Sequence, residues 1–333
     1  MSRVTILLPF RNAAETLDAA IASITSQTFK DWTLQLIANG ATAKELVTAE
    51  HWVDRDPRIH LIHEDRPGIA HALNSGLSAA NSAYIARMDA DDISHPERLA
   101  KQVACLDSHS EIGVLGTCTR FETSVEKSSG MAWFVAWQNG IITPREHYVK
   151  RFVDAPLAHP TAMFRRDLVD RFGGYDTGPL PEDHELWLRW MHHGVQFAKL
   201  PQELLTWRDH PDRLSRNHPN YSVDAFFRTK AWWIAKWYAR KFPGDHPVII
   251  AGTSGICRDR AKLLEDEGMR ITAFTDVKKR EVSGYSFIPH DELPGPGEAL
   301  VISFISQRGT GDRIAAYLAS RGLVEGRDLV LAA

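Results

Sequence analysis

Three carboxylates follow directly on a short apolar run in the first third of the chain. The run covers residues 83–88 and predicts a buried strand. The acids that end it are Asp89, Asp91 and Asp92. In open α/β sheets, ligands bind outside the carboxyl ends of the strands. Asp89 and Asp91 are separated by one small residue and can face a hard cation, Mg²⁺ or Mn²⁺, which takes oxygen ligands and often shares them with substrate phosphates. The alternative is an Asp-rich turn that only caps the helix following Pro96.

A second acidic pair, Glu182 and Asp183, stands just before a stretch with helical periodicity. A carboxylate buried beside another carboxylate has a raised pKa, so that it can exchange a proton closer to neutral pH. The alternative is that one of the two residues simply caps the helix that runs through Leu186 and Trp190.

Length and composition limit the class of protein. At 333 residues the chain is longer than one hydrophobic core usually serves, which predicts two domains. A hydrophobic content of 44% fits a soluble globular protein, and a net charge of −3 gives no electrostatic argument for a nucleic-acid partner. Three widely spaced cysteines argue against a disulfide framework or zinc site and favour a reducing cytoplasm. Strand-like sequence begins almost at the first residue, so we expect no signal peptide, and no apolar run is long enough for a membrane span.

The elements that must position these acids alternate in type through the first half of the chain. Strands are predicted at 4–8, 32–37, 59–62 and 83–88, and helices at 14–26, 44–53 and 69–79. Further strands are expected at 112–115 and 157–164, and a helix at 186–192. This order predicts an α/β fold with a mostly parallel sheet and helices on both faces.

The pattern restarts after Pro243, which predicts a second domain. Strands are expected at 248–252, 271–274, 300–305 and 329–331, with helices at 256–267 and 312–320. The domains therefore divide as 1–216, a linker at 217–245, and a small Rossmann-like α/β domain at 246–333. Its glycine turn, 252–255, lacks the full dinucleotide-binding pattern, which favours a role in assembly or acceptor positioning over cofactor binding.

The linker 217–245 is rich in aromatic and basic residues. It predicts a helix with apolar side chains around much of its circumference. One interpretation is peripheral attachment to the anionic inner face of a membrane. The other, which the lack of a clean polar face favours, is a helix packed into the core.

Four ordered stretches resemble the family 2 inverting glycosyltransferases of the GT-A fold, over residues 3–216. They are 4–12 with 26–32, Asp89-Ala90-Asp91 with 96–99, 159–166 with 173–176, and 182–189 with 207–210 and Ser215. The resemblance implies metal-dependent transfer of a hexosyl group from a nucleotide-diphosphate donor to a hydroxyl of a glycan or lipid-linked acceptor.

The resemblance also implies a role for individual residues. Asp183, with Glu182 beside it, matches the catalytic base. The implied ligands of Mn²⁺ or Mg²⁺ are Asp89, Asp91 and His210. The implied nucleotide and diphosphate contacts are Pro9, Phe10, Arg11, Glu15, Asn39, Arg66, Asp89, Arg208 and Ser215.

The chain departs from the family at Ala38 and Asn39, where relatives usually carry two aspartates. An asparagine can accept from uracil N3–H and donate to O4, so a UDP-sugar is expected, although an amide also matches the thymine and cytosine edges. Two other functions stay open. A non-catalytic nucleotide-sugar-binding subunit would explain the altered pair. A sugar nucleotidyltransferase would normally carry a Gly-rich, basic first loop, whereas residues 9–12 read Pro-Phe-Arg-Asn.

Overall fold

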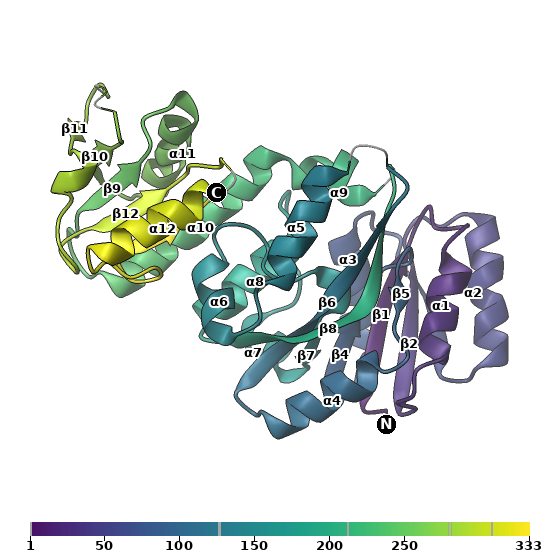
Figure 1. Cartoon of the computed structure of the whole chain (residues 1–333). Helices are drawn as coiled ribbons and strands as arrows, with labels where there is room; N and C mark the ends of the chain where they lie inside the picture. Colours follow the sequence, from purple (N-terminus) through teal and green to yellow (C-terminus); the bar gives the residue numbers. More distant parts are fainter. Residues whose placement is uncertain (1, 126–127, 212, 279, 281, 308) are drawn as a thin grey trace. The chain divides into compact units, whose positions relative to one another are not determined.

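The computed structural model describes residues 2–125, 128–211, 213–278, 280, 282–307 and 309–333 (Figure 1). The chain divides into two compact units. The first combines Met1–His147 with Pro156–His218, and the second combines Tyr148–Ala155 with Pro219–Ala333. The aromatic and basic segment, from Pro219 onward, falls within the second unit.

The first unit is built on a sheet that has eight strands in the described residues, in the order β3-β2-β1-β4-β7-β6-β8-β5. The strands are β1 (Val4–Phe10), β2 (Trp32–Ala38), β3 (Ile59–His63), β4 (Tyr84–Arg87), β5 (Ile93–Ser94), β6 (Ile112–Thr123), β7 (Met163–Arg165) and β8 (Gln196–Asp209). Strands β1 to β4 pair in parallel, β7 is antiparallel to both of its neighbours, and β6 and β8 are parallel. The sheet is therefore mixed, with the predicted parallel part at one side.

Helices cover the sheet on both faces. They are α1 (Leu17–Thr25), α2 (Ala43–Arg55), α3 (Ile69–Ala79), α4 (Arg98–Ser108), α5 (Ser129–Asn139), α6 (Pro144–Lys150), α7 (Asp167–Phe172), α8 (Glu182–His192) and α9 (Leu214–Asn217), with a 3₁₀ turn at His159–Thr161. Two hydrophobic clusters result, and β1 contributes Ile6 to one and Leu7 to the other. A strand buried on both faces is expected to be apolar throughout, which explains why the β1 sequence does not alternate.

Close packing of α3 on the sheet depends on a glycine. A Cβ at Gly76 would lie 2.8 Å from Leu7 Cδ2 and 2.9 Å from Ile37 Cδ1. The helix can therefore approach β1 and β2 closely, and their carboxyl ends are held in a single edge of the sheet.

Some predicted elements differ from the structure. The strand expected at 157–164 is instead the 3₁₀ turn followed by the short β7, because Pro160 lacks the N–H that a strand pairing needs. Helix α8 begins at Glu182, earlier than the predicted residue 186. Strand β8 was not predicted at all, since Pro201 and the polar residues around it interrupt the apolar pattern.

The second unit contains a five-stranded parallel sheet in the described residues, in the order β11-β10-β9-β12-β13. Its strands are β9 (Val248–Ala251), β10 (Ile271–Thr275), β11 (Ser286–Phe287), β12 (Leu300–Ser303) and β13 (Leu329–Leu331). Its helices are α10 (Val223–Lys241), α11 (Gly255–Asp266) and α12 (Thr310–Ser320), with 3₁₀ turns at Pro219–Tyr221 and His290–Glu292. The strand order reverses between β9 and β12, as in Rossmann-like sheets, which confirms the predicted α/β architecture of this part.

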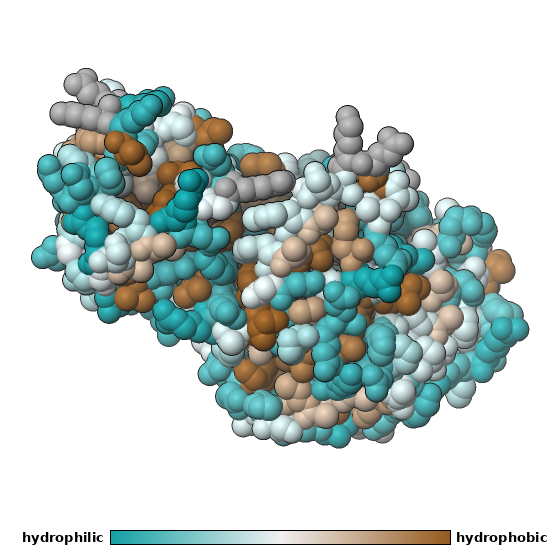
Figure 2. All heavy atoms as spheres, viewed as in Figure 1, coloured by the Kyte–Doolittle hydropathy of each residue, from teal (hydrophilic) through white to brown (hydrophobic). Residues whose placement is uncertain are grey.

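Helix α10 carries the aromatic and basic residues of the predicted linker. Phe227, Trp233 and Trp237 are buried, whereas Trp232 and Lys236 lie on its exposed side. Attachment to a membrane through this helix stays a prediction. Among the described residues no helix has the length and apolar character needed to cross a bilayer. On the face seen in Figure 2, hydrophobic residues form small groups among hydrophilic ones.

Candidate active site

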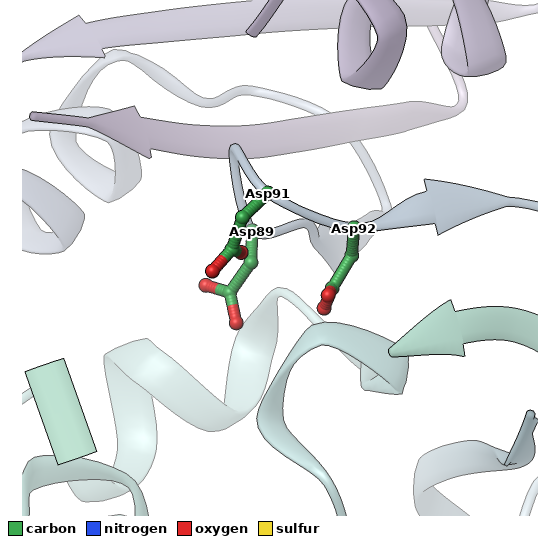
Figure 3. Close-up of side chains that lie close together, drawn as sticks. All are labelled: Asp89, Asp91 and Asp92. Atoms are coloured by element: carbon green, nitrogen blue, oxygen red, sulfur yellow. The ribbon is translucent and has the colours of Figure 1, made fainter. Parts of the chain in front are cut away.

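The acidic turn, residues 89–92, lies between β4 and β5. Oxygen atoms of Asp89, Asp91 and Asp92 all lie within 4.8 Å of one another, and Figure 3 shows the three side chains leaving the turn on the same side. The side chains of Asp89 and Asp91 are 20% exposed, and that of Asp92 is fully buried. Since β4 lies between β1 and β7 in the sheet, the turn sits at the edge formed by the carboxyl ends of the parallel strands.

Buried polar contacts hold the chain on both sides of this turn. The amide of Gln27, at the end of α1, donates to Ser94 Oγ at 3.0 Å and accepts from the N–H of Leu99 at 3.0 Å. Gln27 therefore connects α1 to the segment that follows the acids. This contact gives a physical reason for glutamine at that place in the motif at 26–32.

Two buried arginines lie beneath the turn. Arg87 Nη2 donates to Asp89 Oδ1 at 2.5 Å. Arg98 Nη1 donates to the carbonyls of Arg87 and Pro160, at 3.1 and 2.6 Å. Burial lowers the pKa of Arg98 to about 10. Burial also lowers the pKa of Arg87. The negative charge of Asp89, followed by those of Tyr175 and Glu182, raises this pKa by more, so the net shift is upward.

Strand β8 and the loop after it bring basic residues to the turn. His210 Nε2 donates to Asp91 Oδ2 at 2.9 Å. The backbone N–H of Arg208 donates to Asp92 Oδ1 at 3.0 Å, and Arg208 Nε donates to the Asp91 carbonyl. The Nη2 atom of Arg208 is buried and has no hydrogen-bond partner in the described part of the chain. An unpaired buried guanidinium nitrogen is costly, so this donor is poised for an anionic ligand.

The side chain of Arg213 completes the group. Its Nη2 lies 3.4 Å from Asp89 Oδ2, and its Nη1 lies 3.7 Å from Asp91 Oδ2 and 3.6 Å from Asp92 Oδ1. No sequence motif indicated Arg213, although it stands in the same short segment as His210 and Ser215.

The pKa values of Asp91 and Asp92 shift in opposite directions because their surroundings differ. Burial raises the pKa of Asp91, but the hydrogen bond from His210 and the charge of Arg213 outweigh it, so the net shift is downward. Burial raises the pKa of Asp92 well above its usual value, and Asp91 and Asp89 add to this against the opposing charge of Arg213. Asp91 is therefore the stronger candidate for a metal ligand, because a ligand carboxylate must be ionised.

The donor set of the turn fits a hard divalent cation. Asp89 and Asp91 offer the carboxylate oxygens that Mn²⁺ and Mg²⁺ prefer, and His210 offers an imidazole nitrogen, which is a more usual ligand of softer divalent metals. A further buried oxygen, Asp92 Oδ2, has no hydrogen-bond partner among the residues described. The chemistry of these residues therefore suits the predicted metal.

The second acidic pair opens α8. Glu182 is buried, and its Oε1 lies 3.9 Å from His159 Nδ1. His159 Nε2 lies 2.8 Å from the Tyr175 hydroxyl. Asp183 is half-buried, and its Oδ1 accepts from the N–H of His184 at 2.7 Å. This last bond satisfies one free N–H at the helix start, so a capping role is compatible with a catalytic one.

Electrostatic effects connect this pair with the acidic turn. Burial raises the pKa of Tyr175, and the charges of Glu182, Asp183 and Asp89 raise it further against the opposing effect of Arg87. Burial also lowers the pKa of His159 well below its usual value, with Arg87 adding to the shift, so its imidazole is neutral. Both acidic groups thus act on one buried hydroxyl, which the sequence did not indicate.

The predicted nucleotide residues lie at the ends of β1 and β2. Phe10 pairs with Ala38 in parallel register, so Pro9, Phe10 and Asn39 share one edge with the acidic turn. Arg11 passes over Gly40, where a Cβ would lie 3.6 Å from its Nε atom.

One of these residues has surroundings that the sequence did not predict. Glu15 is exposed and pairs with Lys44 at 2.6 Å. Ser215 lies in α9, and its side chain is outside the described part of the structure.

Asn39 serves a structural purpose in this conformation. Its amide donates to the carbonyls of Glu64 and Arg66, both at 2.8 Å, and its carbonyl accepts from the N–H of Gly68 at 3.0 Å. Arg66 in turn pairs with Glu64 at 2.8 Å, and this hydrogen bonding lowers the pKa of Glu64. Asn39 therefore shapes the loop at 64–68, and direct contact with a base stays a prediction.

Comparison with known proteins identifies the family of the chain. Residues 5–173 match the model of glycosyl transferase family 2. The chain belongs to this family. EpsE of Bacillus subtilis is 32% identical over 67% of this chain and 78% of that protein. The amylovoran biosynthesis glycosyltransferase AmsE of Erwinia amylovora is 30% identical over 65% of this chain and 79% of that protein. The predicted family is confirmed, and the chain is a glycosyltransferase.

Solved structures confirm the GT-A fold. The mannosyltransferase PcManGT of Pyrobaculum calidifontis, in complex with GDP-Man and Mn²⁺, matches with a TM-score of 0.51 at 19% identity, over 80% of this chain and 69% of that chain. S. aureus TarS 1–349 in complex with UDP-GlcNAc matches with a TM-score of 0.56 at 13% identity, over 80% of this chain and 71% of that chain. At these identities the likeness concerns the fold alone.

Proposed function

We propose that this glycosyltransferase inverts the anomeric centre of a UDP-sugar while transferring it to a hydroxyl of a glycan or lipid-linked acceptor. The observation that carries the proposal is the acidic turn, where oxygens of three aspartates lie within 4.8 Å of one another after a strand of the mostly parallel part of the sheet. The nucleotide sugars named for PcManGT and TarS support such a donor. AmsE is named for amylovoran biosynthesis and WbnJ of Escherichia coli for O-antigen biosynthesis, which supports a surface-glycan acceptor.

Asp91, Asp89 and His210 would hold a divalent cation. Such an ion, when bound, stabilises the negative charge that develops on the departing diphosphate. Asp91 is ionised by its hydrogen bond with His210, and Asp89 is oriented by Arg87. The free Nη2 of Arg208 can donate to a phosphate oxygen, for which the planar guanidinium is well shaped.

Asp183 would remove the proton from the acceptor hydroxyl. The acceptor oxygen then forms a bond with the anomeric carbon while the bond to the diphosphate oxygen breaks, and the proton stays on the Asp183 carboxylate. A single displacement of this kind needs one base and no covalent enzyme nucleophile, which accounts for inversion.

The nucleotide would bind along the ends of β1 and β2. One side of this nucleotide site would be formed by Pro9, Phe10 and Arg11. Asn39 acts there through the loop at 64–68, since its amide positions the backbone that carries Arg66. In this arrangement the base contact would come from the loop, because both amide hydrogens of Asn39 are donated to its carbonyls.

Transfer by purified protein tests the proposal. UDP-sugars and GDP-sugars are offered with Mn²⁺ and an acceptor glycan, and release of the nucleoside diphosphate is followed. Asp183→Asn is expected to keep donor affinity and to lose about a thousandfold in kcat, within the range that a general base supplies. Asp54→Asn, at an exposed position on α2 of the same unit, is the matched control. Normal turnover in Asp183→Asn would remove the base assignment.

A binding subunit without activity is the second candidate, which the altered Ala38–Asn39 pair favours. It predicts donor binding in the same panel with neither transfer nor hydrolysis. Metal-dependent hydrolysis of any nucleotide sugar by the purified chain would exclude it.

A further inference from the structure

Arg213 occupies an unusual place in the acidic turn. Its guanidinium nitrogens lie 3.4 to 3.7 Å from oxygens of all three aspartates. The side chain is 9% exposed, so this contact is largely protected from solvent. Arg213 also donates from Nη1 to the Arg208 carbonyl at 2.8 Å and lies over the Trp207 ring, 4.7 Å from its centre.

The oxygens that Arg213 approaches are the ones a metal would need. Asp89 Oδ1 already accepts from Arg87, which leaves Asp89 Oδ2 as its second oxygen, and this is the aspartate oxygen nearest Arg213. Asp91 Oδ2, which accepts from His210, is the second. A divalent cation and a guanidinium at the same two oxygens would repel each other strongly in a partly desolvated turn.

Charge balance gives Arg213 a purpose in the metal-free protein. Three carboxylates with oxygens within 4.8 Å of one another destabilise a buried turn unless positive charge lies among them. Arg87 compensates Asp89, and Arg213 lies near oxygens of all three acids.

We propose that Arg213 is an exchangeable counter-cation of the acidic turn. Its guanidinium neutralises the three aspartates while no divalent cation is bound, and it leaves them when metal and donor bind. The freed guanidinium then becomes available to the anionic diphosphate, beside Arg208. Arg213 lies in the short connection between the end of β8 at Asp209 and the start of α9 at Leu214, where a side chain can turn without disrupting a sheet. This inference rests on the proposed function of the acidic turn.

Metal affinity without donor tests the exchange directly. Free Mn²⁺ is measured by electron paramagnetic resonance during titration of the purified full chain, without nucleotide. Arg213→Gln removes the competing charge, so it is expected to bind Mn²⁺ about tenfold more tightly than the wild type, as expected when a repelling charge near a cation is lost. Arg171→Gln, an exposed position on α7 that pairs with Asp167, makes the same charge change and should leave Mn²⁺ affinity unchanged.

The second measurement separates exchange from a structural role. With saturating Mn²⁺, Arg213→Gln is expected to raise the KM for the nucleotide sugar and to lower kcat, because one diphosphate contact is lost. Tighter metal binding together with weaker donor use is the signature of exchange. A purely structural arginine would weaken both.

Several outcomes would overturn the inference. One is Arg213→Gln binding Mn²⁺ no more tightly than the wild type. Another is a wild type that binds no Mn²⁺ while the variant does, which would make Arg213 a permanent substitute for the metal. If Arg213→Gln does not fold, Arg213→Lys keeps the charge on a more compact head and should show intermediate Mn²⁺ affinity, and equal affinity to the wild type would again overturn the proposal. A wild type that binds Mn²⁺ but transfers no sugar would instead contradict the proposed function.

Discussion

Each sheet of this protein places an aspartate just after a parallel strand, and the two sites differ in how those acids are satisfied. Asp91, after β4, accepts from one histidine and lies in a group of charges drawn from separate elements. Asp276, after β10, accepts from the N–H and hydroxyl of Thr253 at 3.0 and 2.7 Å, and from the N–H of Val277 at 2.8 Å. The Asp91 carboxylate can therefore still bind a ligand, whereas the Asp276 carboxylate already accepts hydrogen bonds from the loops around it.

The glycine turn beside Asp276 is also closed. Gly252 has φ +104°, and a Cβ there would lie 2.7 Å from Cys257 Sγ and 3.0 Å from Ile305 Cγ1. Glycine is required here for packing within the second unit. An acid at the end of a strand therefore indicates a ligand site only when its neighbours leave it free.

The largest difference between the two sites should appear in catalysis. Asp91→Asn removes a charged ligand of the predicted metal, so kcat/KM should fall about a thousandfold, as expected when several kcal/mol of charge stabilisation are lost. Asp276→Asn is the matched change in the other unit and should leave kcat/KM unchanged. Steady-state transfer at varied Mn²⁺ checks both. Equal losses in the two variants would abolish the distinction.

The buried cations of the two units provide a second comparison. Arg87 is surrounded by acids that keep it charged. Lys230, in α10, donates to the carbonyls of Val153 and Ala332, at 3.1 and 2.7 Å, and burial lowers its pKa to about 7 despite the nearby charge of Asp154. A buried amine held mainly by neutral carbonyls is expected to lose its proton more readily.

Lys230 should make stability depend on pH. Between about pH 7 and the ordinary lysine value of 10.5, the unfolded chain binds a proton that the folded chain does not. Stability from this group therefore rises with pH through that window and is lost as pH falls, by up to about 1.4 kcal/mol per pH unit. Urea unfolding of wild type and Lys230→Met at several pH values should show a difference with this slope. If the difference in free energy of unfolding between the two proteins stays constant between about pH 7 and 10.5, the lowered pKa of Lys230 is contradicted.

The smallest effect, on the free energy of unfolding, is expected at the hydrogen bond between Thr253 and Asp276. Thr253→Val removes the hydroxyl that donates to Asp276 and should lower the free energy of unfolding by about 1 kcal/mol. The KM for the nucleotide sugar should not change. Thr253→Ser keeps the hydroxyl and should restore the stability measured in urea. A rise in KM with Thr253→Val would indicate that the second unit contributes to donor binding after all.

Much of the first unit could be predicted because its signals are local. Each of β1, β2 and β4 is marked by an apolar run, and the helices between them by helical periodicity. Both patterns can be recognised within a short stretch of sequence. Strand β8 was missed because it is polar over much of its length, and its pairing with β6 and β5 depends on residues far away in the chain. Asn39 is predicted to contact the nucleobase because a side-chain amide can hydrogen-bond to uracil. Only the tertiary structure shows that this amide hydrogen-bonds to the loop at 64–68.

By itself the sequence determined the family, the acidic residues at the end of β4 and the acidic start of α8, since residue type and short-range spacing are enough to recognise them. Only the tertiary structure decided which charges meet. His210 reaches Asp91, and Arg213 reaches all three acids, because β8 pairs with β5 across more than a hundred residues of chain. Electrostatic effects act over a few ångströms of space and not along the sequence, so the balance of charge at the site could be established only once the sheet had been assembled.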